Sequence, residues 1–183
     1  MKKKFTNLEI AALFRRMAAA YQILNENRFK IIAYDRAADS IEHLTSEVKD
    51  LWDDGKLGEI PGVGTQIVAH IDELFRTGKN KHFESVMSRV PQSVFPLLSV
   101  SGIGPKRAYK LITELKLKNE RTVVADLEKA GRAGRIAPIE GFGEKSQEEI
   151  LKNIESYKKG SVKENRIPLA EADIIAGDIT KKT

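Results

Sequence analysis

The segment Ile60-Pro61-Gly62-Val63-Gly64 is the first of three copies of one short pattern: an apolar residue, any residue, glycine, an apolar residue and glycine. The other copies, at intervals of 40 and 39 residues, are Val100-Ser101-Gly102-Ile103-Gly104 and Ile139-Glu140-Gly141-Phe142-Gly143. An aliphatic residue stands seven positions after the last glycine of each copy: Ile71, Leu111 and Ile150. A repeat of this period indicates one supersecondary unit used three times. Each unit is predicted to be a helix, a short turn and a second helix, with the central apolar residue between the helices.

The sequence around these turns has the apolar spacing of helices. Phe14, Met17, Tyr21 and Leu24 show this spacing, and no stretch shows the sustained alternation of a strand. The fold class is therefore predicted to be all-α, with short helices and three helix-hairpin-helix units. We expect helices over residues 6–24, 28–43, 46–54, 65–76, 80–88, 105–116, 122–130, 144–158 and 168–177.

Several of these helices have recognisable start signals. Thr6 is followed three residues later by Glu9, the pattern of a capping box. Asn27 and Thr45 are predicted N-caps. Pro105 stands where a proline is tolerated as the first helical residue.

The composition excludes several classes of protein. The chain has 183 residues, no cysteine and 31 Lys plus Arg against 26 Asp plus Glu. Disulfide scaffolds, zinc ribbons and thiol chemistry are excluded. No apolar run approaches the roughly 20 residues of a membrane span, and Met1–Lys4 is not followed by the apolar stretch of a secretory signal. We therefore expect a cytoplasmic protein without a membrane partner.

The turns predict contact with the phosphates of a nucleic acid. Glycines remove the Cβ atoms that would keep a ligand away from the backbone amides. The second helix then begins at once, so its unpaired N–H groups and positive dipole end can face an anion such as a DNA phosphate. A net charge of +5 gives little non-specific attraction, so contact must come from a few placed groups. The alternative is that each Gly-x-Gly is only a tight turn between helices.

The three copies differ in the charges around them. The second is followed by Lys106, Arg107 and Lys110, which makes it the best candidate for a phosphate contact. The first is followed by the neutral donors Thr65 and Gln66. The third is surrounded by carboxylates that repel phosphate, so we expect a structural role for it; these are Glu140, Glu144, Glu148 and Glu149.

Several segments resemble the N-terminal region of family X DNA polymerases, the polymerase beta type. They are residues 30–38 (KIIAYDRAA), 60–65 (IPGVGT), 71–79 (IDELFRTGK) and 100–105 (VSGIGP). Residues 141–145 (GFGEK) and 166–172 (RIPLAEA) are similar to bacterial and archaeal members in particular. The resemblance extends over about residues 8–176.

This resemblance implies a domain plan and a partner. Residues 1–90 would form a helical domain that grips the 5′ side of a DNA gap, and residues 91–160 a fingers-like domain whose hairpin holds the primer strand. Residues 161–183 resemble the lead-in to a polymerase palm. Because the palm follows this segment in the family and the chain stops at Thr183, we expect no polymerase active site and no magnesium site. The expected state is a monomer that binds DNA, with a palm domain or another repair protein as a further partner.

The resemblance also implies a monovalent cation, Na⁺ or K⁺, at each of the first two hairpins. Main-chain carbonyl groups hold this ion in the family. The matching carbonyls are those of Gly58, Ile60 and Val63 in the first hairpin and Leu98, Val100 and Ile103 in the second.

Members of the polymerase beta type can also remove a 5′-deoxyribose phosphate through a lysine Schiff base. The matching position here is His70, whose imidazole does not form the required imine. Two phosphate-binding lysines of the family fall at Gln66 and His82, whereas Lys30 and Tyr34 match its phosphate contacts. Phosphate binding by Lys30 and Tyr34 is therefore expected without efficient catalysis.

The function predicted from the sequence is DNA binding without sequence specificity, at the backbone phosphates of gapped or nicked duplex. The chain would be the N-terminal region of a family X repair polymerase or a stand-alone relative. Two alternatives remain: a lyase in which Lys30 is a displaced nucleophile, and a protein-interaction module built from hairpins.

Overall fold

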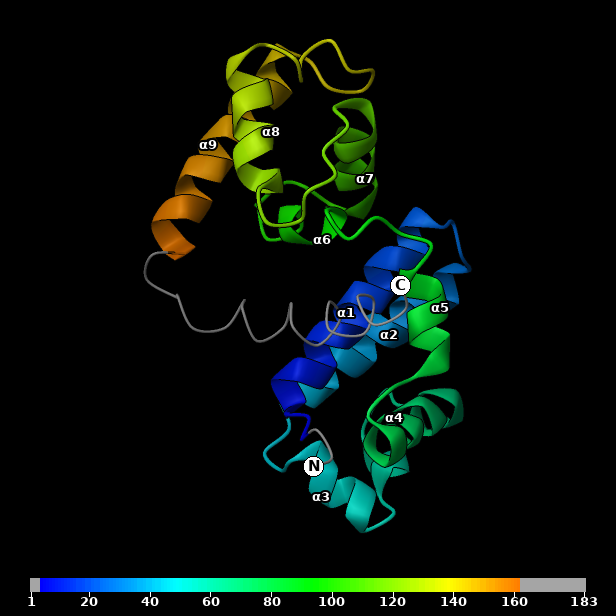
Figure 1. Ribbon diagram of the computed structural model, residues 1–183. Coiled ribbons are helices and arrows are strands. Elements are labelled where there is room, and N and C mark those ends of the chain that lie inside the picture. The colour runs from blue at the N-terminus through cyan, green and yellow to red at the C-terminus, as the bar shows by residue number, and fades with distance from the viewer. Residues whose placement is uncertain (1–3, 162–183) are drawn as a thin grey trace. The chain divides into compact units, whose positions relative to one another are not determined.

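The computed structural model of the chain describes residues 4–161 (Figure 1). All regular elements in this range are helices, which confirms the predicted fold class. The predicted helix over 168–177 and the segment 162–183 lie outside the described residues. The elements are α1 (Asn7–Ile23), α2 (Arg28–Glu42), α3 (Val48–Asp53), the 3₁₀-helix η1 (Leu57–Glu59), α4 (Thr65–Thr77), α5 (Lys81–Met87), α6 (Val94–Leu97), α7 (Pro105–Glu114), α8 (Val123–Arg132) and α9 (Glu144–Ser161).

The chain divides into two compact units, Met1–Pro91 and Gln92–Thr183. In the first unit, α1 and α2 lie side by side, and α5 also packs on α1 (Figure 1). Four rings, those of Phe14, Tyr21, Tyr34 and Phe83, meet edge to face at centroid distances of 5.3 to 6.0 Å. These contacts join α1, α2 and α5 around one aromatic core.

The second unit is built from α6 to α9. Its largest fully buried side chains are aliphatic: Leu97, Leu111, Leu127, Ile136 and Ile154. They come from α6, α7, α8, the loop before α9 and α9. In the described part of the chain, no helix is long and apolar enough to cross a membrane.

The aliphatic residue seven positions after the last glycine of each copy is buried. Ile71, Leu111 and Ile150 have exposed fractions of 0%, 0% and 2%. In the first two hairpins the helix before the turn is much shorter than the helix after it, since η1 precedes α4 and α6 precedes α7. In the third hairpin, α8 ends at Arg132, seven residues before Ile139. Neither η1 nor α6 was predicted from the sequence, because a segment of one turn is too short to show the helical period.

Three of the predicted helix starts are confirmed. Thr6 and Glu9 form a reciprocal capping box. The Asn27 side chain accepts a hydrogen bond from the amide of Phe29, and Pro105 begins α7.

The prediction that Thr45 is an N-cap is wrong. Glu47 is the N-cap of α3 and makes no side-chain capping bond. Instead, Asn7 Oδ1 accepts from the amide of Val48 at 2.7 Å, and Asn7 Nδ2 donates to the carbonyl of Ser46 at 2.9 Å. The cap of α3 is therefore supplied by a residue of α1 that is about forty positions earlier in the chain.

The Asn7 cap gives a direct test of this packing. Asn7→Ala is expected to lower the free energy of unfolding of the first unit by about 1–2 kcal/mol, because a buried amide and a carbonyl lose their partners. Thr45→Ala is the matched control and should change it by less than about 0.5 kcal/mol. Urea denaturation followed by the fluorescence of Trp52, the single tryptophan, measures both. Equal losses in the two variants would contradict the assignment of the cap.

Candidate nucleic-acid interface

The three glycine turns share one hydrogen-bond pattern. In each turn the amide of the central apolar residue donates to the carbonyl three residues earlier: Val63 to Ile60 at 3.1 Å, Ile103 to Val100 at 3.2 Å and Phe142 to Ile139 at 2.9 Å. In each, the last glycine accepts the first bond of the following helix, from Val68, Ala108 and Gln147 at 2.9, 2.9 and 3.0 Å. The sequence repeat is therefore also a repeat of backbone geometry.

The first glycine of each turn is in the left-handed region that favours glycine. The φ angles of Gly62, Gly102 and Gly141 are 77°, 79° and 83°. The last glycines differ: Gly64 and Gly104 are extended N-caps with φ of −80° and −83°, whereas Gly143 has φ of 143°. The third turn thus has the same hydrogen bonds as the other two, but the backbone conformation of its last glycine is different.

Gly64 and Gly104 leave the starts of α4 and α7 uncovered. A glycine N-cap carries no side chain to accept from the first amides of its helix. A Cβ atom added at Gly64 or Gly104 would have nothing within 4 Å. The amides of Gln66 and Ile67, and those of Lys106 and Arg107, are thus presented at two open turns.

The central residues of the first two turns are buried as predicted. Val63 is 7% exposed and Ile103 is 4% exposed. Phe142 in the third turn is only half-buried, and its ring lies 4.9 Å from the guanidinium carbon of Arg107. The prediction for the central residue therefore holds for two of the three turns.

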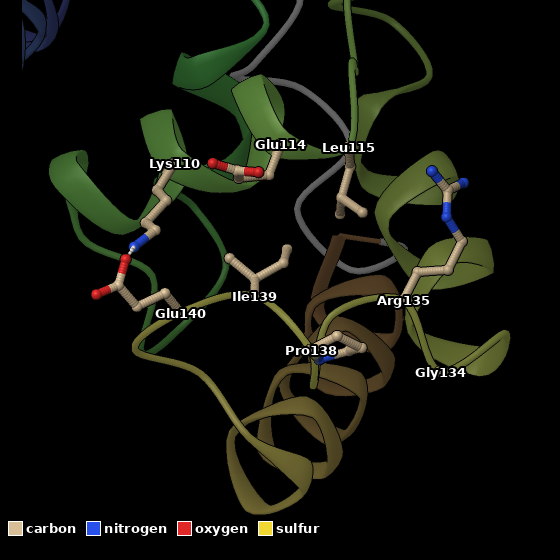
Figure 2. Close-up of a pocket in the computed structure, with 8 residues that line it drawn as sticks. All are labelled: Lys110, Glu114, Leu115, Gly134, Arg135, Pro138, Ile139 and Glu140. Atoms are coloured by element: carbon tan, nitrogen blue, oxygen red, sulfur yellow. Dashed lines mark ion pairs between the residues drawn. The ribbon is translucent and has the colours of Figure 1, made fainter.

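The structure brings the predicted cations of the second hairpin together on α7, but two of them also contact the third hairpin. The Arg107 guanidinium donates to the Gly102 carbonyl at 3.0 Å and lies 4.9 Å from the centre of the Phe142 ring. Lys110 Nζ is 3.8 Å from Glu140 Oε2 (Figure 2). Lys106 is exposed. These contacts were not predicted from the sequence, since a separation of about thirty residues along the chain does not indicate that two side chains are close.

A groove of about 600 Å³ lies beside the Lys110–Glu140 pair in the second unit (Figure 2). Its lining carries both signs of charge, from Lys110 and Arg135 and from Glu114 and Glu140, with Leu115, Pro138 and Ile139 as apolar residues. Because the charges are mixed, the groove does not by itself define a phosphate site.

In the first unit, Thr65 and Gln66 are exposed at the start of α4, as a phosphate contact requires. Lys30 Nζ lies 4.9 Å from the centre of the Tyr21 ring and 3.6 Å from Glu26 Oε2. The prediction that Tyr34 contacts phosphate needs correction, because Tyr34 is 3% exposed and packs among aromatic rings. Burial also raises the pKa of its hydroxyl, so Tyr34 is a neutral core residue.

Two histidines stand side by side where the resemblance implies lysines. The His70 and His82 rings stack with a centroid distance of 5.0 Å and an interplanar angle of 9°. The Tyr21 hydroxyl is 2.5 Å from His82 Nε2 and is hydrogen-bonded to Tyr34. This pairing was not predicted from the sequence, since nothing local indicates that α4 and α5 bring the two histidines together.

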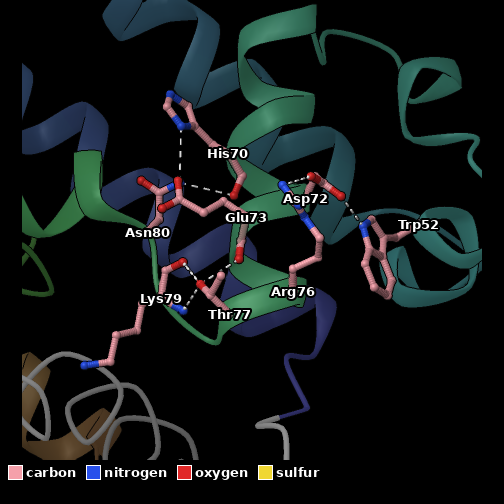
Figure 3. Close-up of polar contacts among 8 residues, drawn as sticks. All are labelled: Trp52, His70, Asp72, Glu73, Arg76, Thr77, Lys79 and Asn80. Carbon is pink, nitrogen blue, oxygen red and sulfur yellow. Dashed lines mark hydrogen bonds and ion pairs between the residues drawn. The ribbon is translucent and has the colours of Figure 1, made fainter.

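The Asn80 side chain faces His70 and favours its neutral form (Figure 3). Asn80 Oδ1 accepts from the amide of Phe83, so its nitrogen faces His70 Nδ1 at 3.2 Å and Glu73 Oε2 at 2.9 Å. The same nitrogen is also 3.2 Å from the His70 carbonyl, so its two hydrogens face three acceptors. Because an amide nitrogen only donates, its contact with His70 Nδ1 is a hydrogen bond when that atom carries no proton and the ring proton is on Nε2. That Nε2 atom is buried and has no hydrogen-bond partner among the described residues.

Burial lowers the pKa of both rings. For His70 the charge of His82 lowers the pKa further, with a smaller contribution from Lys30, while Glu73 opposes the shift. For His82 the nearby Lys30 lowers it after burial, against Glu26 and Glu73. Both imidazoles are therefore neutral near pH 7, and protonating either one is disfavoured in the folded state.

This pair makes the stability of the first unit depend on pH. The folded-state pKa values lie below the roughly 6.5 of an unfolded histidine, so below that pH the unfolded chain binds more protons than the folded chain. The melting temperature of wild type, followed by Trp52 fluorescence, should fall between about pH 7.5 and about pH 5.5.

His82→Phe keeps a ring but removes one titrating group, so it should reduce this pH dependence. His43→Gln is the control, because His43 is exposed and should leave the dependence as in wild type. The same pH dependence in wild type and His82→Phe would contradict the role of the pair.

Comparison with known proteins agrees with this geometry. Residues 5–80 match the model of a helix-hairpin-helix domain, and residues 95–156 match that of a SAM-like helix-hairpin-helix tandem. The chain is 28% identical over 171 residues to DNA polymerase/3′-5′ exonuclease PolX of Bacillus subtilis (strain 168), and 25% identical over 187 residues to DNA polymerase lambda of Arabidopsis thaliana. The matches cover 93% and 92% of this chain but 28% and 34% of the relatives, so the chain spans about a third of their length. The chain therefore has two helix-hairpin-helix domains and is similar, over more than nine-tenths of its length, to parts of two DNA polymerases, in agreement with the resemblance to family X polymerases.

Proposed function

We propose that this chain binds DNA without sequence specificity through the backbone phosphates of gapped or nicked duplex. It acts in this proposal as the N-terminal region of a family X repair polymerase or as a stand-alone relative. The observation that carries the proposal is the geometry shared by the turns at Gly62–Gly64 and Gly102–Gly104. Both have the same hydrogen-bond pattern, an extended glycine N-cap and open space in front of the next helix.

The chemistry of these turns suits a phosphate oxygen. Each one presents backbone N–H groups and the positive end of a helix dipole, at a point where no Cβ atom limits the approach. The first hairpin adds the hydroxyl and amide donors of Thr65 and Gln66, and Lys30 of the first unit adds a cation. In the second hairpin, Pro105 has no backbone N–H group to donate, but the side chains of Lys106, Arg107 and Lys110 supply positive charge. Such contacts position a protein on DNA without reading bases.

Na⁺ or K⁺ is a proposed cofactor of both turns. The candidate ligands are the carbonyls of Gly58, Ile60 and Val63 in the first turn and those of Leu98, Val100 and Ile103 in the second. The equal hydrogen-bond patterns support this, because the Ile60 and Val100 carbonyls each accept one amide and keep a second lone pair. A bound cation would place a positive charge next to the phosphate.

The first consequence is binding that is sensitive to salt and tolerant of sequence. With roughly 3 to 5 phosphates engaged, a plot of log K against log salt concentration should have a slope of about −3 to −5. Fluorescence anisotropy with a labelled one-nucleotide-gapped duplex and a scrambled duplex of the same length measures this slope. Undetectable binding at about 50 mM salt, or strong preference for one sequence, would contradict the proposal.

The glycine N-caps test the backbone contact itself. Gly64→Ala and Gly104→Ala each add one methyl group into open space at an unstrained φ, so each should weaken DNA binding by roughly three- to tenfold while the far-UV circular dichroism is kept. Gly160→Ala, another site with nothing within 4 Å, is the control at the end of α9. Unchanged affinity in both hairpin variants would show that phosphates do not approach these amides.

A further inference from the structure

The third hairpin and α9 contact the second hairpin at three points. Asn153 Nδ2 of α9 donates to the carbonyl of Ser101 at 2.9 Å. The Phe142 ring faces Arg107 at 4.9 Å, and Glu140 pairs with Lys110 at 3.8 Å. These contacts involve the turn that is the best candidate for phosphate and two of its three cations.

Arg107 is fixed from two sides. One guanidinium nitrogen, Nη1, donates to the Gly102 carbonyl at 3.0 Å, and the guanidinium also lies against the Phe142 ring. A guanidinium has five N–H donors, so this arrangement uses one and leaves others for a ligand. A long side chain held in one orientation loses less conformational entropy when it binds a phosphate.

Lys110 has a looser contact. Its partner Glu140 has a side chain that is 97% exposed, and the Lys110 side chain is 37% exposed. Ion pairs in such surroundings are weak, so a phosphate can replace Glu140 without a large loss. Glu140 keeps the ammonium group near the turn in the absence of DNA and competes with phosphate for it.

We propose that the third hairpin controls how the cations of the second hairpin meet DNA, with Phe142 orienting Arg107 for phosphate and Glu140 competing with phosphate for Lys110. This inference rests on the proposed DNA-binding function and assigns a role to the one hairpin whose acidic surroundings disfavour phosphate. Phe142 is a positioning residue in this arrangement, because it acts on DNA through Arg107, whereas Glu140 opposes phosphate binding through its pair with Lys110.

The test of Phe142 compares two substitutions at one position. Phe142→Leu removes the π face that holds the guanidinium, and Phe142→Tyr keeps it. We expect Phe142→Leu to weaken binding to the gapped duplex by about three- to tenfold and to reduce the salt slope by about 1, as the loss of one phosphate contact does. Phe142→Tyr should bind as wild type does. The reduced salt slope separates loss of a phosphate contact from a general loss of stability, which is followed by thermal circular dichroism.

A second variant keeps the test independent of the packing of Phe142. Arg107→Lys preserves the charge but loses the planar group that stacks and donates in a fixed geometry, so it should resemble Phe142→Leu. The double variant should be no weaker than either single variant, because both remove the same contact. The proposal would be overturned if Phe142→Leu had the affinity and salt slope of wild type, or if the losses in the double variant were fully additive. In both cases the proposed function would stand as long as the wild-type protein binds DNA. Absence of binding by wild type would instead overturn the proposed function.

Glu140 is tested against a carboxylate of the same hairpin. Glu140→Gln and Glu148→Gln remove the same charge, but only Glu140 pairs with Lys110 among the described residues. At about 50 mM salt, the DNA affinity of Glu140→Gln should therefore be roughly two- to threefold higher than that of Glu148→Gln. Equal gains would show that the restraint of Lys110 has no effect on binding.

Discussion

A left-handed glycine inside each turn is the constraint on which the arrangement depends. Residues with a side chain rarely adopt φ near +80°, and Gly62, Gly102 and Gly141 all do. This angle allows the next apolar residue to bond back to the carbonyl three positions earlier. In the first two turns the chain then continues into an extended glycine and a helix start with exposed amides. The backbone, more than any side chain, therefore forms the proposed phosphate site.

The three turns share one hydrogen-bond pattern but are surrounded by different charges. Neutral donors follow the first turn, cations follow the second and carboxylates surround the third. Repeated units can diverge in this way because the hydrogen-bond pattern depends on glycines and apolar residues, while the exposed positions vary without effect on the turn. In the second unit this leads to one hairpin suited to an anion and a neighbouring hairpin that contacts its cations.

The first unit shows how packing changes the chemistry that a family resemblance suggests. The resemblance places lysines at the positions of His70 and His82, and here these residues form a stacked, neutral pair in which His82 is hydrogen-bonded to Tyr21. Tyr34 lies in the aromatic core beside them, so it supports the pair and does not reach the surface. Lys30 lies next to this cluster, over the Tyr21 ring, and its half-exposed ammonium group is accessible to solvent.

The sequence alone determined the helical class, the three glycine turns, the spacing of Ile71, Leu111 and Ile150 after them, and most helix ends. These features depend on residues within one or two helical turns of each other, so their periodicity and glycine spacing are readable locally. Only the tertiary structure decided the Asn7 cap of α3, the histidine pair and the contact between Arg107 and Phe142. Each of these joins residues separated by about twelve to forty positions, through hydrogen bonds, stacking and desolvation that exist only after the helices pack. A spacing along the chain does not encode such contacts, because their free energy comes from the packed arrangement.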